Sequence, residues 1–170
     1  MLSFVDTPTD IPDSGCIANI APPLFATATI NTISNRPYIH AELGFTSLVP
    51  ENWFEVEPGM FSPYPAMELP IPVIAYRFPS SIDDYVSRII VNGFYAYDAL
   101  PDAIDRFQLN GRVWTLYQIE RADQAVYSSF AFSESDVPYV IGVTAITAEE
   151  RDYLYDALLI PVIEAFRIND

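Results

Sequence analysis

The chain has 170 residues, of which 51% are hydrophobic and 14% are aromatic, and this composition fits one sheet-rich globular domain. It holds 23 acidic residues against 8 basic ones, all arginine, and the formal net charge is −15. A field of this sign repels phosphate backbones and anionic lipids, which argues against nucleic acid and membrane-surface partners. The absence of lysine excludes a Schiff-base lysine and a P-loop lysine.

The amino-terminal region predicts an extended or disordered leader over residues 1–24, followed by a single α+β domain over residues 25–170. Prolines interrupt a polar stretch there, and the basic and apolar regions of a signal peptide are missing. Cys16 is the single cysteine, so we expect neither an internal disulfide nor a thiolate metal site. No run of about 20 apolar residues is present, so we expect no membrane insertion.

Short apolar runs separated by turn residues predict several strands in the first half of the domain. We expect these strands at residues 24–33, 38–41, 44–49, 53–56, 60–61 and 73–78. Trp53 is expected to pin its hairpin to the core. The stretch Ser80-Ser81-Ile82-Asp83 predicts an N-cap and a weak capping-box acid for a helix over residues 81–91, in which apolar residues recur at helical spacing and which stops at Asn92-Gly93.

The stretch from Leu109 to Ile146 predicts the most regular part of the fold, an antiparallel meander. Its strands are expected at residues 105–110, 112–121, 125–133 and 137–146. Asn110-Gly111 is the strongest hairpin signal in the chain, because both residues accept the left-handed backbone conformation that a two-residue turn requires. The meander is therefore the expected scaffold of the domain.

A final helix is predicted after the meander. Thr147 and Glu150 form a capping-box pattern, and the helix is expected to run to about Ile168. Pro161 cannot donate a hydrogen bond to the Ala157 carbonyl, so a kink is expected there. Antiparallel strands with one inserted and one closing helix indicate an α+β fold of about eight strands and two helices.

The meander carries aromatic side chains that could bind a ligand, although core packing explains such residues better. The candidates are Trp114, Tyr117, Tyr127 and Tyr139, with Tyr95 and Tyr97 from the preceding segment. Trp114 and Tyr117 alternate to opposite faces of one strand. We expect both helices on one face, and the amino-terminal segment or a partner on the other. Binding is predicted at a face where either side chain is exposed, and in the loops if both are buried.

No catalytic residue, cofactor or metal site is predicted. His40 is the only imidazole, and a nucleophile such as Thr46 or Ser47 would need it as a base, but neither lies in a Gly-x-Ser-x-Gly elbow. One His and one Cys exclude an ordinary zinc site and leave only an all-oxygen ion. The acidic groups considered are Glu134 with Asp136, Asp98 with Asp102 and Asp105, and Asp83 with Asp84. Turn and helix-start preferences explain each of them.

The chain resembles PsbP-like domains in the run from Phe45 to Val49, which ends in Pro50 and is followed by Trp53. A central helix, a meander and a final helix ending near Phe166 continue the pattern. The segments also resemble modules that accompany alpha/beta-hydrolases or beta-lactamase-like serine hydrolases in bacteria, often in exported proteins. This resemblance implies an α-β-α sandwich, a non-catalytic role and an extracytoplasmic location, and it assigns no functional residue.

Two functions are therefore considered. The first is a non-catalytic accessory or interaction domain that uses a sheet face or the proline-rich loop at residues 62–72. The alternative is a small hydrolase or ligand carrier that uses carboxylates and an aromatic cleft. A homodimer is possible if a strand edge in the amino-terminal half is unpaired.

Overall fold

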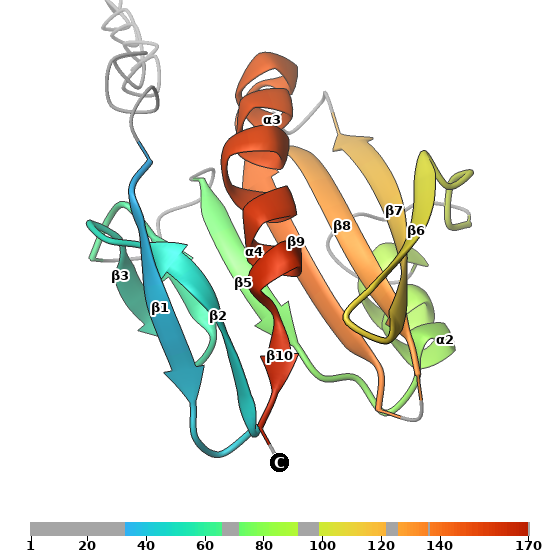
Figure 1. The fold of residues 1–170 in the computed structure, drawn as a ribbon. Helices are drawn as coiled ribbons and strands as arrows, with labels where there is room; N and C mark the ends of the chain where they lie inside the picture. The colour runs from blue at the N-terminus through green and yellow to red at the C-terminus, as the bar shows by residue number, and fades with distance from the viewer. Residues whose placement is uncertain (1–32, 66–71, 92–98, 122–125, 136, 170) are drawn as a thin grey trace, which may run out of the picture.

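The computed structural model describes residues 33–65, 72–91, 99–121, 126–135 and 137–169, which form two antiparallel sheets with helices (Figure 1). The smaller sheet has the order β1 (Asn35–His40), β2 (Phe45–Pro50) and β10 (Arg167–Ile168). The larger sheet has the order β3 (Phe54–Glu57), β4 (Met60–Ser62), β5 (Val73–Arg77), β9 (Tyr139–Ala145), β8 (Val126–Glu134), β7 (Arg112–Arg121) and β6 (Asp105–Leu109). The predicted α+β class with an antiparallel sheet is confirmed.

The predicted meander is present, and its strands begin and end close to the expected positions. Asn110 has φ 54° and Gly111 has φ 75°, so both residues of the β6–β7 turn adopt the left-handed conformation. Leu109 and Arg112 pair directly across this turn. The predicted two-residue hairpin is therefore confirmed.

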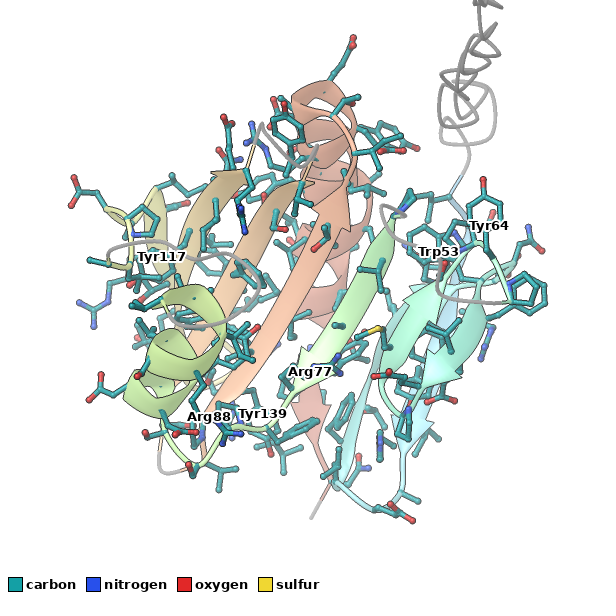
Figure 2. The ribbon with its side chains drawn as sticks, turned by 180° about the vertical axis from the view of Figure 1, so that it is seen from behind. Trp53, Tyr64, Arg77, Arg88, Tyr117 and Tyr139 are labelled. Atoms are coloured by element: carbon teal, nitrogen blue, oxygen red, sulfur yellow. The ribbon has the colours of Figure 1, made fainter. Side chains whose placement is uncertain are left out.

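Helices cover both faces of the larger sheet, which corrects the expectation that they share one face. On one face, α2 (Ile82–Tyr85) continues into the π-helical turn η1 (Val86–Val91). On the other lies the helix made of α3 (Ala148–Leu154), η3 (Tyr155–Leu159) and α4 (Ile160–Ala165) (Figures 1 and 2). The core is split accordingly: Trp114 and Leu116 belong to the larger cluster beneath the final helix, and Ile119 belongs to the smaller cluster beneath α2.

Both helices begin at the predicted N-caps. The Asp84 amide donates to Ser81 Oγ at 3.0 Å, and the Glu150 amide donates to Thr147 Oγ1 at 3.1 Å. The Glu150 carboxylate reaches one residue further back than in an ordinary capping box and accepts from the Ile146 amide at 3.0 Å. Side-chain oxygens thus satisfy amides that have no partner within the helix.

The end of the final helix differs from the prediction. The helix stops at Ala165, Phe166 is extended, and Arg167 and Ile168 pair with Thr46 and Phe45 on β2. Burial of the Phe166 ring, which stacks on Phe45 with centroids 5.3 Å apart, overrides the helical pattern of the apolar residues. The kink predicted at Pro161 stays a prediction; the helix is π-helical over η3, which ends two residues before Pro161, and the Ile160 amide donates to the Tyr155 carbonyl.

Some of the predicted elements and residues lie outside the part of the chain that the structure describes. These are the leader, the first predicted strand up to residue 32, the helix stop at Asn92-Gly93, most of the proline-rich loop, and the side chains of Tyr95, Tyr97, Asp98 and Asp136. Trp53 is half-buried against the larger core cluster, as predicted for the residue that anchors the β3 hairpin.

Replacement of Glu150 by glutamine is expected to change how stability depends on pH. Glu150 is 7% exposed, and burial raises the pKa of its carboxyl above the ordinary 4.5, although the Ile146 amide acts in the opposite direction. Because the folded state binds the Glu150 proton more tightly than the unfolded state does, this proton stabilises the folded protein below pH 4.5. The stabilisation is lost as the pH rises through the pKa of Glu150 in the folded state. Relative to the wild type, E150Q should therefore become more stable as the pH increases across this interval.

Urea unfolding at a series of pH values between about 4 and 8 measures this difference. The exposed neighbour Glu149 supplies the matched variant, E149Q, whose stability difference from the wild type should vary less with pH. A pH-independent difference for E150Q would contradict the prediction.

Candidate functional site

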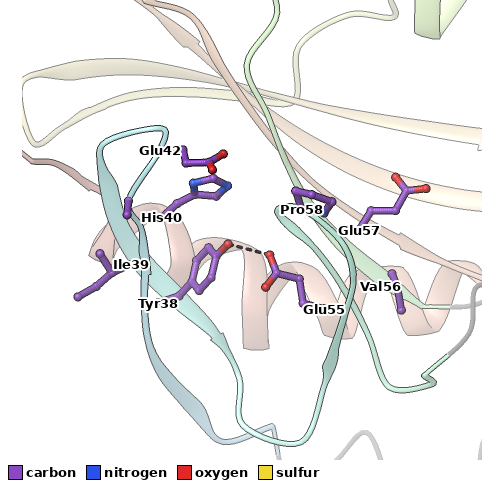
Figure 3. A pocket seen from close by; sticks show the side chains of 9 residues that line it. Tyr38, Ile39, His40, Glu42, Glu55, Val56, Glu57 and Pro58 are labelled. Atoms are coloured by element: carbon purple, nitrogen blue, oxygen red, sulfur yellow. Dashed lines mark hydrogen bonds between the residues drawn. The ribbon is translucent and has the colours of Figure 1, made fainter.

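A groove of about 520 Å³ lies between the edges of the two sheets (Figure 3). It is lined by the consecutive residues Tyr38, Ile39, His40, Ala41 and Glu42 on one side, and Glu55, Val56, Glu57 and Pro58 on the other. β1 and β3, which supply most of these residues, are the outermost strands of their sheets. Because consecutive residues line it, the groove presents backbone as well as side chains.

Gly59 shapes the far side of this groove by allowing a tight turn between β3 and β4. Its φ is +71°, which a residue with a side chain rarely adopts. A Cβ atom there would also lie 3.3 Å from the Tyr76 carbonyl oxygen, while the Gly59 carbonyl accepts from the Tyr76 amide at 2.8 Å. Glycine therefore holds the turn close against β5.

A hydrogen bond joins the two walls of the groove. The Tyr38 hydroxyl donates to Glu55 Oε1 at 3.0 Å (Figure 3), and the Gly59 amide donates to the same oxygen at 2.9 Å. Burial, reinforced by this carboxylate, raises the pKa of the Tyr38 hydroxyl, so it remains a donor at physiological pH. The same ring packs edge-on against Phe61 in the core, with centroids 4.9 Å apart. Tyr38 thus connects the groove to the folded interior.

The groove is negatively charged. It is lined by Glu42, Glu55 and Glu57. Among the described arginines, Arg77 comes nearest to an ion pair with these residues, with its Nη2 4.0 Å from Glu57 Oε2. The Glu57 side chain is nevertheless 58% exposed, so this pair is solvated and weak. The arrangement favours a cationic ligand.

The His40 ring is held by its own strand and turn. Its Nδ1 accepts from the Leu43 amide at 3.3 Å, and the ring stacks on Phe45 with centroids 5.5 Å apart. Ser47 is buried and donates to the Val162 carbonyl at 2.8 Å, and Thr46 faces the opposite side of β2 from Ser47. These contacts give Ser47 a structural role.

The four aromatic candidates from the meander do not meet on one surface. Trp114 and Tyr139 are buried in the larger cluster, beneath the final helix. Tyr117 is half-buried on the α2 face beside Phe132, with ring centroids 5.0 Å apart, and Figure 2 shows it well separated from Tyr139. Tyr127 is half-buried on the face of β8 that the final helix covers. A binding role for these residues stays a prediction.

Only some of the acidic groups considered for a metal lie within the described residues, since Asp98, Asp136 and the Glu134 side chain lie outside them. Within the described residues, no group of three or more His, Cys, Asp or Glu side chains is close enough to hold an ion. Asp84 serves the helix start instead and lies 3.5 Å from Arg88, while Asp105 Oδ1 accepts from the Arg106 amide at 2.7 Å. In the part of the chain that the structure describes, no helix has the length and apolar character needed to cross a membrane.

The sequence predictions passed over Tyr38, Glu42, Glu55 and Glu57 as members of short strands and turns. Charged residues commonly protect an outermost strand from pairing with another chain, so these glutamates alone did not indicate a binding site. One feature of the sequence could have indicated this site. Two short strands lie beside the Pro58-Gly59 turn, and short strands of this kind often form the exposed edge of a sheet.

No family model matches the chain, and no curated protein matches its sequence. The solved structures with similar folds include Mog1p and CyanoP. Mog1p of Saccharomyces cerevisiae, a Ran-binding protein, has 12% identity and a TM-score of 0.51, covering 82% of this chain and 97% of its own. The cyanobacterial PsbP protein CyanoP of Synechocystis sp. PCC 6803 has 13% identity and a TM-score of 0.51, covering 86% of this chain and 99% of its own. The chain therefore has the PsbP-like fold that the sequence resemblance implied, and Mog1p shares it.

Proposed function

We propose that the protein is a non-catalytic interaction domain, and that the acidic groove formed by residues 38–42 and 55–58 binds an extended basic segment of a partner protein. The observation that carries this proposal is the position of Glu42, Glu55 and Glu57 in an open groove between two outermost strands. The Ran-binding role of Mog1p, a protein of similar fold, supports the view that such a domain presents a protein-binding surface.

Charge complementarity determines the kind of partner. The chain carries a formal charge of −15, so it attracts basic proteins over a distance and repels acidic ones. At short range, Glu55 Oε1 accepts two hydrogen bonds, which fix the carboxylate, and its second oxygen, Oε2, can accept from an incoming donor. Arginine or lysine side chains suit this position.

The strand edges and nearby apolar side chains favour an extended segment. An outermost strand presents unpaired backbone donors and acceptors, which a peptide can satisfy by adding a strand. Ile39 on β1 is 66% exposed, and Leu43 and Phe54, which are sequence neighbours of the lining segments, are 39% and 50% exposed. A segment that alternates basic and apolar residues would match both features.

We also propose where the partner segment comes from. The sequence resemblance to hydrolase-associated modules supports an accessory role in an exported bacterial protein, where the bound segment would belong to a neighbouring domain or protein. The hydrolase or carrier alternative receives less support, because Trp114 and Tyr139 are buried and Ser47 is engaged with Val162. A second copy of the chain is disfavoured as occupant because two acidic grooves repel each other.

A short peptide in which arginine and valine alternate is the probe for this proposal. We expect it to bind with an affinity that falls about tenfold in the double variant E55Q/E57Q, because two exposed charge pairs contribute roughly 0.5–1 kcal/mol each. Glutamine at residue 55 can still accept from Tyr38 and Gly59, so the groove should keep its shape. Isothermal titration calorimetry measures the affinities.

The control must separate the groove from the general negative charge. E149Q/D156N removes the same two charges from exposed positions on the final helix and should leave the affinity within about twofold of the wild type. Equal losses in both double variants, or equal binding of a glutamate–valine peptide, would overturn the proposal. Concentration-dependent dimerisation that competes with the peptide would instead identify a second copy as occupant.

A further inference from the structure

A second pocket, of about 350 Å³, lies between the β6–β7 turn and β10. Its lining residues are Asn110, Gly111, Arg112, Ser135, Phe166, Arg167 and Ile168. Two of the eight arginines of this acidic chain therefore share one small pocket, and no described residue that lines it is acidic.

Neutral groups hold the Arg112 guanidinium in place. Its Cζ lies 4.7 Å from the centroid of the Tyr139 ring, and its Nη1 donates to Ser133 Oγ at 3.1 Å, to the Val137 carbonyl at 3.3 Å and to Ser135 Oγ. None of these groups neutralises the charge, and an arginine in a protein stays protonated. Burial lowers the pKa of Arg112, which is the direction expected for a cation without a carboxylate partner.

Arg167 is fixed in the same manner. Its Nη1 donates to the carbonyls of Glu164 and Phe166, both at 2.7 Å. Asn110 Nδ2 donates to the same two carbonyls, at 3.1 and 3.3 Å, so the turn and the chain after the final helix hold each other in position. The second arginine of the pocket is thus also oriented by neutral acceptors.

Three other arginines of the described chain have carboxylate partners. Arg77 lies near Glu57, Arg88 near Asp84, and Arg151 is bonded to Glu120 and Asp152. Among the described residues, neither Arg112 nor Arg167 makes an ion pair, although acidic residues outnumber basic ones almost threefold in the sequence.

We propose that this pocket binds a small oxyanion, either a phosphate group or a dicarboxylate, between the guanidinium groups of Arg112 and Arg167. Arginine presents planar pairs of donors that match the oxygens of both ligand classes. The pocket is separate from the acidic groove, so this proposal stands independently of the peptide-binding one.

Inorganic phosphate and succinate are the two probes, titrated separately at constant ionic strength and followed by NMR chemical shifts of the backbone amides. We expect saturable binding of at least one probe, with the largest shifts around residues 110–112 and 166–168. R167Q should weaken that binding about tenfold, which is the loss of one charge-assisted contact. R36Q removes the same charge from an exposed position on β1 and should change the affinity less than about twofold.

The relative affinities of the two probes assign the ligand class, and tighter binding of either one supports the proposal. R112K keeps the charge but loses the planar donor pair, and it should also weaken binding while the protein remains folded by circular dichroism. The proposal is overturned if neither probe saturates, if the shifts lie elsewhere, or if R36Q and R167Q weaken binding equally.

Discussion

Replacement of Trp114 by alanine is expected to lower the free energy of unfolding by about 3–5 kcal/mol. Trp114 is 1% exposed in the larger cluster, where it meets the Phe166 ring edge-on with centroids 5.5 Å apart. Alanine would leave a cavity between the sheet and the end of the final helix. Urea unfolding followed by far-ultraviolet circular dichroism measures the loss without depending on the removed indole.

The exposed aromatic residue Phe54 supplies the comparison for Trp114. It is 50% exposed on β3, so F54A should change the free energy of unfolding by about 0.5 kcal/mol or less. The contrast locates the core: W114A should unfold more easily, whereas F54A should unfold much like the wild type. Similar stability losses in both variants would contradict the assignment of Trp114 to the core.

Replacement of Gly142 by alanine is expected to lower the free energy of unfolding by about 1–3 kcal/mol. Gly142 on β9 pairs directly with Phe130 on β8. A Cβ atom at residue 142 would lie 2.5 Å from Phe130 Cδ1, a separation at which one of the two must move. The Phe130 ring is 4% exposed and packed among the residues beneath α2, so little room is available for that movement.

A double-mutant cycle identifies the cause of this loss. F130L removes the ring that occupies the space over Gly142, so G142A should cost less in the F130L background than in the wild type. Urea unfolding of the four proteins gives the coupling energy. If the two substitutions were additive, the loss would come from the strand backbone and not from contact with the ring.

Local patterns were sufficient to predict most of the secondary structure. The Asn110-Gly111 turn, the N-caps Ser81 and Thr147 and the strands of the meander all depend on neighbouring residues, and all were predicted. The helix end was not, because the apolar spacing continues beyond Ala165 and only contact with distant Phe45 shows that Phe166 leaves the helix.

The placement of the helices and the groove depends on contacts between distant segments. The two apolar faces of β7 indicate that both sides are covered, but nothing in the strand indicates which helix covers which side. The groove likewise arises where residues near Tyr38 meet residues near Glu55 across two sheets. Each segment taken alone is an ordinary short strand followed by a turn.

The strand β10 couples the start of the domain to residues made much later in synthesis. Arg167 and Ile168 pair with β2, and the Asn169 amide donates to the Gly44 carbonyl at 2.8 Å, next to the turn that leads out of β1. During translation the β1–β2 hairpin can form early, but its third strand appears only after residues 167–169 leave the ribosome. Because such distant pairings form slowly, the acidic groove should acquire its final shape late in folding, which delays binding until the whole domain has assembled.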